Sequence, residues 1–370
     1  MSSDRIHLDI VVPSAHANID KLYSLCSLNV PNDLIVHFYF VLDNPEAADT
    51  VSENHFKNKP VTIIKNVNNL GAHQSRNKGF EAGSSEYVLF LDDDVEAPPN
   101  LLLNYLEAIN KSPKSPGFVG PVKFPPSNNL NAKAAVASDI LTFWDIPKTT
   151  PKIAWGITAN LMVRREAVGD IRFSPTFPKK GGGEDVDFCL RIVEKCGSWF
   201  ESVPNAELVH PWWAAGKQQY KRFGRWAYGD STLPVLHPKY RFRNAPNLLE
   251  TISILSLLAV LAFVFFTVGI EWFLAWLLIA PLAELFMDGL RMRYTGKKLA
   301  PTISARATAI RLSNDLGRLA GHLKNMHFLG LTERFDYFMT GEHIRYERTV
   351  ALSKFLFYVI LAILLFLTLG

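Results

Sequence analysis

The chain has 370 residues, which is enough for one large domain or two domains of ordinary size. Apolar residues make up 48% of the chain and charged residues 20%, so the composition excludes a disordered protein. The net charge of only +4 excludes the concentrated basic excess that is typical of nucleic-acid-binding proteins, and no nucleic-acid partner is expected. The three cysteines show neither zinc-site nor disulfide-framework spacing, which agrees with a reducing compartment.

Short apolar runs alternate with helix-like segments over the first third of the chain. Each run is rich in β-branched and aromatic residues and is bounded by polar or turn residues, which is the pattern of a strand. The alternation predicts an α/β fold with a mostly parallel sheet flanked by helices, in which ligands bind beyond the carboxyl ends of the strands. The predicted strands are Leu8 to Pro13, Leu34 to Leu42, Val61 to Lys65, Tyr87 to Leu91, and then residues 117–124 and 157–163, and residues 199–211 are predicted as a strand and loop. The predicted helices are Asn18 to Leu28, Gly71 to Ala82, and residues 98–110 and 184–195.

Long apolar runs begin after Asn247. Thr251 to Ile270 carries no charge over twenty residues, which is the length that the core of a bilayer requires. Membrane helices are therefore expected at about 249–270, 272–290 and 351–369. The second of these is interrupted by a proline and two acidic residues, so it either spans with a kink or lies partly in the interface.

The segment 291–348 between these apolar runs carries eleven Lys/Arg and five Asp/Glu residues. Positive charge marks the cytoplasmic side of a membrane, so this segment and the N-terminal domain are expected on the same side. Within it, Ile303 to Leu323 has the spacing of an amphipathic helix that lies on anionic headgroups or, equally, packs on the catalytic domain. The sequence thus predicts an integral membrane protein with a cytosolic domain at 1–246 and a membrane region at 247–370.

The strongest local signal follows the apolar run Tyr87 to Leu91, where three consecutive carboxylates stand: Asp92, Asp93 and Asp94. Adjacent like charges repel, so a fold retains them only if a positive group compensates. Mg²⁺ or Mn²⁺ suits this site because it prefers carboxylate oxygens and keeps positions open for substrate phosphates. The alternative is a solvated acidic turn.

The neighbouring strands also end in chemically useful residues. Pro13 and Ser14 end the first strand, and Asp43 follows the second, where its carboxylate can accept hydrogen bonds from a base or a ribose. Between the third and fourth strands, glycines, amides and a cation gather near the start of a helix, a location suited to anionic ligands. These residues are Asn69, Gly71, Arg76, Asn77 and Gly79.

A glycine run at 181–183 leads into a helix whose first turn holds Glu184, Asp185 and Asp187. Acidic residues in a first turn often only complement the helix dipole. The functional interpretation is a carboxylate that acts as a general base.

Two further candidates lie downstream. A single histidine such as His210 is usually structural, but after a carboxylate cluster it becomes a candidate metal ligand. Arg222, Arg225 and Trp226 place cations beside aromatic rings, which suits either a clamp on a diphosphate or a belt next to a membrane.

Together and in this order, these segments resemble glycosyltransferase family 2 and its GT-A fold over about residues 6–230. The resemblance rests on Val12-Pro13, Asp43, the stretch from Asn69 to Gly79, Phe90 to Asp94, and Glu184-Asp185 ahead of Leu190-Arg191. The chain departs from the family in the turn after Ser14 and in the residues after Asp43, and an arginine replaces the glutamine of a Q-x-x-R-W motif at Arg222.

The resemblance implies a role for each matching residue. Asp43 would contact the nucleotide base, Asp92 and Asp94 would handle ribose and metal, and Asp185 would be the catalytic base. His210 resembles the metal-ligating histidine of some members. The candidate catalytic residues are Asp185 and Glu184, and the candidate metal ligands are Asp94, Asp92 and His210. The candidate donor-binding residues are Pro13, Ser14, Asp43, Asn69, Gly71, Arg76, Asp92, Asp93, Arg222, Arg225 and Trp226.

The resemblance implies an inverting glycosyltransferase that depends on Mn²⁺ or Mg²⁺. Its donor would be a UDP-, GDP- or dTDP-sugar, and its acceptor a hydroxyl of a glycan or of a membrane-proximal, lipid-linked molecule, with membrane lipid as a partner. The alternatives are a processive polysaccharide synthase, a polyprenyl-phosphate sugar synthase, a nucleotidyltransferase and a non-catalytic membrane scaffold.

Overall fold

The computed structural model describes residues 5–266, 270–294 and 300–369. The chain forms two compact units: the first comprises Met1–Ser127 and Leu141–Ala215, and the second comprises Asn128–Ile140 and Gly216–Gly370. This division differs from a single boundary after residue 246, because residues 128–140 and the segment from Gly216 onward belong to the second unit.

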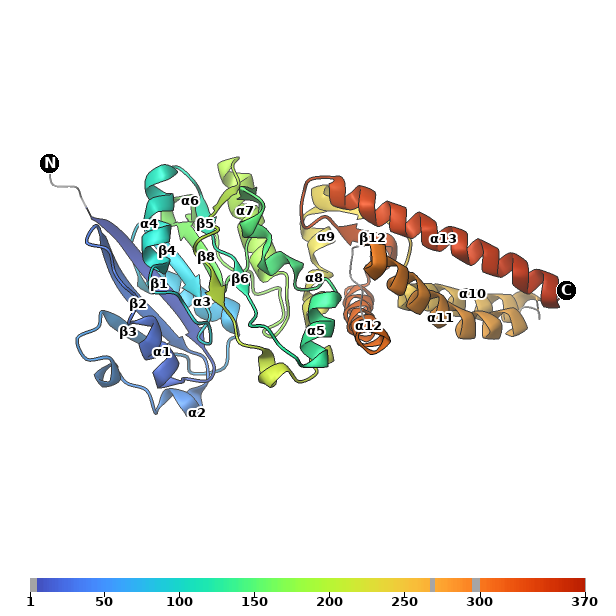
Figure 1. Cartoon of the computed structure of the whole chain (residues 1–370), viewed down its shortest axis with the longest axis horizontal. Helices are drawn as coiled ribbons and strands as arrows, with labels where there is room; N and C mark the ends of the chain where they lie inside the picture. The colour runs from blue at the N-terminus through green and yellow to red at the C-terminus, as the bar shows by residue number, and fades with distance from the viewer. Residues whose placement is uncertain (1–4, 267–269, 295–299, 370) are drawn as a thin grey trace. The chain divides into compact units, whose positions relative to one another are not determined.

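The first unit is built on an eight-stranded sheet with the order β3-β2-β1-β4-β8-β5-β9-β7 (Figure 1). The strands β1 to β4 are parallel to one another, as the sequence predicts. The sheet becomes mixed beyond β4, since β8 is antiparallel to both β4 and β5. The strands are β1 (Ile6–Ser14), β2 (Leu34–Leu42), β3 (Val61–Lys65), β4 (Tyr87–Leu91), β5 (Gly117–Val119), β7 (Lys152–Ile153), β8 (Asn160–Arg164) and β9 (Phe200–Ser202).

Both faces of this sheet are buried. Leu8, Ile10 and Val12 of β1 belong to one apolar cluster and Val11 to the other, because alternate side chains of a strand point to opposite faces. A Cβ on Gly79 would lie 2.4 Å from Val11 Cγ1, so the glycine lets α3 approach β1 closely. The helices of this unit are α1 (Ile19–Leu25), α2 (Pro45–Ala48), α3 (Ala72–Ala82), α4 (Leu101–Lys111), α6 (Arg165–Val168) and α7 (Glu184–Cys196), with 3-10 turns at Glu53–Phe56, Thr142–Trp144, Ile146–Lys148 and Trp213–Gly216.

The strand predicted at 117–124 is divided in two. After β5 the chain passes Gly120 and Pro121, and it then pairs as β6 (Val122–Lys123) with β10 (Leu208–Val209) in a separate parallel ladder. A Cβ on Gly120 would lie 2.2 Å from Asn160 Nδ2, and a proline has no N–H to donate to a ladder. An antiparallel bridge between Glu96 and Val209 joins this ladder to the chain just after the acidic triplet.

The second unit is mainly helical. Its α12 packs against α8, α5 and α10, which buries one side of the amphipathic segment 303–323, whereas Leu316 and Leu323 of the same segment are exposed. The elements are α5 (Leu130–Ala137), α8 (Tyr220–Asp230), α9 (Leu233–Leu236), a 3-10 turn at Pro238–Tyr240, β11 (Arg241–Arg243), α10 (Leu248–Phe266), α11 (Ile270–Tyr294), α12 (Pro301–Lys324), a 3-10 turn at Phe328–Thr332, β12 (Glu333–Phe335) and α13 (Glu342–Leu369).

Helices occupy all three segments that were expected to cross a membrane. Within the described residues, however, none of the helices combines the length with the apolar character that crossing a bilayer requires. The expected spans at 249–270, 272–290 and 351–369 are therefore not supported, and residues 267–269 of the first lie outside the described part. In α11, Glu284 forms an ion pair with Lys354 of α13 and accepts a hydrogen bond from the Tyr358 hydroxyl, so charged side chains interrupt the apolar character of these two helices.

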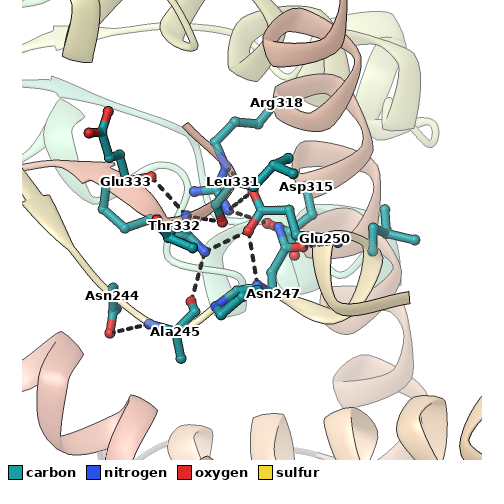
Figure 2. A network of polar contacts seen from close by, with 12 residues as sticks. Asn244, Ala245, Asn247, Glu250, Asp315, Arg318, Leu331, Thr332 and Glu333 are labelled. Carbon is teal, nitrogen blue, oxygen red and sulfur yellow. Dashed lines mark hydrogen bonds and ion pairs between the residues drawn. The ribbon is translucent and has the colours of Figure 1, made fainter. Parts of the chain in front are cut away.

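A buried network of polar contacts lies at the start of α10 (Figure 2). Glu250 is fully buried and forms ion pairs with Arg318 at 3.1 Å and with Arg334 at 2.8 Å. Its backbone N–H donates to Asn247 Oδ1, and its carboxylate accepts from the backbone N–H of Asn247, which together form a capping box. One carboxylate thus caps α10 and neutralises cations from α12 and β12.

We expect Glu250→Gln to destabilise the second unit by about 3–5 kcal/mol, because removing one partner of a buried ion pair leaves uncompensated charge. Denaturant unfolding followed by tryptophan fluorescence measures this loss. Glu107→Gln, which changes an exposed glutamate on α4, serves as the control and should leave the unfolding midpoint unchanged. Equal midpoints for the Glu250 and Glu107 variants would show that the network contributes nothing to stability.

The contact between α8 and α12 depends on two glycines. A Cβ on Gly317 would lie 1.8 Å from the carbonyl oxygen of Gly224, a distance that backbone atoms do not tolerate. Gly317→Ala should therefore destabilise the protein by about 1–3 kcal/mol, the usual range for overpacking. Gly289→Ala on α11 is the matched control, because nothing lies within 4 Å of its Cβ and alanine is the better helix former. A Gly317→Ala protein as stable as the wild type would contradict this close helix contact.

Candidate functional site

The carboxyl ends of β1, β2 and β4 bring the N-terminal candidates to one edge of the sheet. Ser14 ends β1 and donates a hydrogen bond from Oγ to Asp93 Oδ2 at 2.5 Å, while the same oxygen accepts from the backbone N–H of Ala17. Burial raises the pKa of Asp93, and its neighbours Asp94 and Asp92 raise it further. Asp93 thus ties the acidic turn to β1. Pro13, the residue before Ser14, is buried in register with Val41.

Arg76 supplies positive charge to the acidic triplet. It lies on α3 with only 4% of its surface exposed, and its Nη2 forms an ion pair with Asp92 Oδ1 at 2.7 Å. The sequence places Arg76 near a phosphate-binding helix start, and the structure adds that it holds the first aspartate of the triplet. Contact between Arg76 and the sugar-nucleotide donor remains a prediction.

The last aspartate of the triplet, Asp94, faces a histidine. His210 follows β10 and is 2% exposed, and its Nε2 lies 3.3 Å from Asp94 Oδ1. Its Nδ1 lies 2.7 Å from the carbonyl oxygen of Pro211, which can only accept, so Nδ1 carries a hydrogen. In the neutral imidazole, Nε2 then presents a lone pair to a carboxylate oxygen, an arrangement that a cation between the two would stabilise.

Asp92, Asp94 and His210 offer ligand atoms that all lie within 4.8 Å of one another. Two carboxylate oxygens and one imidazole nitrogen form a donor set that suits Mn²⁺ or Mg²⁺. The three residues predicted as metal ligands are therefore brought together, and their chemistry fits a divalent cation.

Asp43 is buried and organises a loop. Its Oδ1 accepts from Leu70 N at 2.7 Å and from Asn66 Nδ2 at 2.8 Å, and its Oδ2 accepts from Gly71 N at 2.8 Å. The Asn69 side chain donates to the Asp43 carbonyl oxygen at 2.9 Å. A carboxylate has about four acceptor positions, so the loop fills most of them and leaves little capacity for a nucleotide base. Contact between Asp43 and the base remains a prediction.

Gly71 fits this loop for a specific reason. Its φ of +88° lies in the region that favours glycine, and a Cβ there would lie 2.9 Å from Lys179 Cα. Lys179 in turn donates to the Asn69 carbonyl oxygen at 2.7 Å. The sequence interpretation missed Asn66 and Lys179. Asn66 had a readable signal, since it directly follows the carboxyl end of β3.

The first turn of α7 separates its acidic residues by environment. Asp187 forms an ion pair with Arg191 at 2.7 Å, four residues along the helix. Asp185 accepts from the backbone N–H of Val186. Burial raises the pKa of Asp185 to about 6, against the opposing effects of that hydrogen bond and of the Arg76 charge. Asp185 is thus the acid of this turn suited to proton transfer near neutral pH, while Glu184 stands beside it at the first position of the helix.

The pKa of Asp185 predicts the pH dependence of activity. A general base works only when deprotonated, so kcat/KM should fall tenfold per pH unit below about pH 6 and be level above it. Rates measured from pH 4.5 to 8.5 with saturating divalent cation test this, because saturation separates the base from metal loss. An acid limb near pH 4 would contradict the raised pKa of Asp185 or its assignment as the base.

Arg222, Arg225 and Trp226 lie on α8, in the second unit. Their role in donor binding, which the sequence predicts, remains a prediction.

The comparisons with known proteins concern the family and the fold of the chain. Residues 22–172 match the model of Glycosyl transferase family 2. An uncharacterized glycosyltransferase of Haemophilus influenzae is 30% identical over 116 residues, which are 31% of this chain and 39% of that protein. An uncharacterized glycosyltransferase of Methanocaldococcus jannaschii is 40% identical over 68 residues, 17% of this chain and 23% of that protein. The chain therefore spans well under half the length of these two relatives.

Among solved structures, the chain is similar to the mannosyltransferase PcManGT from Pyrobaculum calidifontis, determined in complex with GDP-Man and Mn²⁺. The TM-score is 0.50 at 17% identity, over 84% of this chain and 87% of that one, so the likeness concerns the fold. The first unit accordingly has a mixed α/β, GT-A-like fold. The segment 22–172 is therefore similar to Glycosyl transferase family 2, and both relatives are described as glycosyltransferases.

Proposed function

We propose that this chain transfers a sugar from a nucleoside diphosphate sugar to an acceptor hydroxyl, with inversion at the anomeric carbon. The observation that carries the proposal is the meeting of Asp92, Asp94 and His210 at the ends of β4 and β10. Asp185, which is half-buried and whose charge interacts with Arg76 and Asp92, adds a candidate base to the same electrostatic network.

Each residue has a distinct part in the proposed reaction. A divalent cation bound by Asp92, Asp94 and His210 would neutralise the charge that grows on the departing diphosphate. Arg76 holds Asp92 in place, and Ser14 holds the acidic turn through Asp93. Asp185 takes the proton from the acceptor hydroxyl as that oxygen attacks the anomeric carbon. One base and one displacement predict inversion, which ¹H NMR of the first product would test: a product of retained configuration would exclude the single displacement.

Binding measurements test the donor class. The full chain is titrated by calorimetry with UDP, GDP and dTDP, in Mn²⁺ and in EDTA. We expect one nucleotide to bind much more tightly in Mn²⁺, since the cation joins the diphosphate to the carboxylates. The absence of nucleotide binding, or equal binding in EDTA, would overturn the proposal.

We also propose that the acceptor is membrane-proximal or lipid-linked. The support is a stripe of exposed apolar side chains with helical spacing along α13, where they can contact lipid. These are Leu352, Phe355, Leu356, Ile360, Ile363 and Leu367. In a flotation assay, we expect the wild-type chain to float with anionic liposomes. The double variant Phe355→Asp, Ile363→Asp should show a smaller fraction of protein bound to the liposomes. Full activity on a soluble acceptor after removal of residues 247–370 would contradict this acceptor class.

A further inference from the structure

Three aromatic rings lie against the candidate metal ligand His210, and a fourth ring stacks on one of them. We call them the aromatic wall: Phe124, Trp144, Trp212 and Trp213. The His210 ring lies 5.5 Å from Phe124, 5.4 Å from Trp144 and 5.2 Å from Trp213, between ring centroids. His210 is almost fully buried, whereas all four members of the wall are half-buried. A partly exposed aromatic surface therefore adjoins the candidate metal site.

The backbone assembles this wall from three separate segments. Phe124 and His210 directly follow β6 and β10, and the parallel register of those strands sets the two rings beside each other. The backbone N–H of His210 donates to the Lys123 carbonyl oxygen at 2.8 Å, which extends the ladder to this position. Trp144 comes from the 3-10 turn at Thr142–Trp144. The same ladder thus positions both the metal ligand and the wall.

Two further features fix the tryptophans. The indole N–H of Trp212 donates to the Pro125 carbonyl oxygen at 2.8 Å, and its ring stacks on Phe124 at 4.6 Å. After Trp213 the chain turns through Ala214 and Ala215, which have φ values of +47° and +54°. Side chains with a Cβ rarely adopt this left-handed conformation, and residues held in it cluster at ligand and active sites. This turn directly follows Trp213, whose ring lies 5.2 Å from the His210 ring.

We propose that the aromatic wall is a sugar-ring subsite, which takes a pyranose with its apolar C–H face packed on the aromatic rings. This inference rests on the proposed function and names the ligand chemistry of the same site. Ligand sites combine aromatic walls with a few polar groups, and half-exposed rings beside His210 and Asp94 have this composition. A sugar joined to a diphosphate at Asp94 and His210 would be within reach of the rings, and so would an acceptor sugar approaching it. The shared chemistry is a pyranose, and its two sources can be separated.

The experiment compares Trp213→Ala, Trp213→Leu and Trp213→Phe in the full chain with Mn²⁺. One arm measures affinity for the sugar nucleotide relative to its bare nucleoside diphosphate. The other measures donor hydrolysis in water and transfer to methyl glycosides of glucose, mannose, galactose and N-acetylglucosamine. Tyr23→Ala, which removes an exposed aromatic ring on α1, is the control and should change neither arm.

For Trp213→Ala we expect either the affinity preference for the sugar nucleotide or the rate of transfer to the methyl glycoside to fall about tenfold. This is the size of effect that a lost aromatic contact produces. A smaller preference for the sugar nucleotide would identify the donor sugar as the occupant. Reduced transfer with unchanged hydrolysis would identify the acceptor sugar. In either case Trp213→Phe should keep most of the wild-type value, because phenylalanine retains a flat ring. Trp213→Leu should show the same loss as Trp213→Ala, because leucine fills space without a flat ring.

Unchanged values in both arms for Trp213→Ala would overturn the subsite. Restoration by leucine as well as by phenylalanine would also overturn it, since the wall would then act by packing alone. Failure of the wild-type chain to bind any nucleoside diphosphate would instead reject the proposed function, and the subsite with it.

Discussion

Asp185→Asn should lower sugar transfer by roughly 10²–10⁴-fold, the usual contribution of a general base, while donor affinity stays within a few-fold of wild type. Asparagine keeps the shape of the side chain and its bond to the Val186 N–H, but it cannot accept the proton of the acceptor hydroxyl. The raised pKa of Asp185, about 6, makes it the acid of this turn matched to proton transfer near neutral pH. The measurement is kcat for transfer, with donor affinity measured in parallel by calorimetry.

Asp187→Asn is the matched control in the same helical turn. The Asp187 carboxylate is held in an ion pair with Arg191, so its loss should lower stability and leave kcat per folded molecule within a few-fold. If Asp185→Asn turned over at the wild-type rate, or if Asp187→Asn were the inactive variant, the assignment of the base would be wrong.

Asp94→Asn should reduce metal-dependent activity by roughly 10²–10³-fold, because several kcal/mol of transition-state stabilisation depends on the bound cation. Asparagine retains an oxygen but removes the charge that faces His210 Nε2 at 3.3 Å. The apparent Kd for Mn²⁺ should rise as well, and part of the lost rate should return at high Mn²⁺ concentration. Rates over a Mn²⁺ titration measure both effects.

Glu96→Gln provides the comparison for Asp94→Asn. Glu96 stands two residues away with an exposed side chain, and its part in the structure is the backbone bridge to Val209, which glutamine preserves. Its variant should behave as wild type. Equal Mn²⁺ dependence in wild type and Asp94→Asn would remove Asp94 from the metal site.

The first four strands were predictable because each is a single apolar run that ends in a polar or turn residue. The ranges Leu34–Leu42, Val61–Lys65 and Tyr87–Leu91 agree with the prediction. The strands β6 and β10 have two residues each, which is too short to show the alternation of apolar and polar residues typical of a strand. The prediction therefore joined β5 and β6 into one strand, and the sequence gave no sign of the ladder that positions His210.

The second unit was less predictable because its long-range contacts have no local signal. Apolar runs alone predicted membrane helices, whereas the pairing of Glu284 with Lys354 joins residues 70 positions apart. The close approach of Gly224 and Gly317 likewise joins α8 to α12 and places α8 in this unit.

In the candidate site, the local motifs could be identified from the sequence, but the distant residues that contact them could not. The acidic triplet and His210 were identified from the sequence, and the structure brings Asp92, Asp94 and His210 together. The distinction between Asp185 and Asp187 was within reach, since Asp187 and Arg191 have the i, i+4 spacing of an ion pair. The contact of Ser14 with Asp93 spans 79 positions and required the fold.

The most direct test of the central claim is nucleoside diphosphate release from a panel of UDP-, GDP- and dTDP-sugars by the purified full chain, in Mn²⁺, Mg²⁺ or EDTA. The account predicts release from one donor, with the divalent cation required and with Asp94→Asn nearly inactive. Release of pyrophosphate, or nucleoside diphosphate release that persists in EDTA, would contradict it.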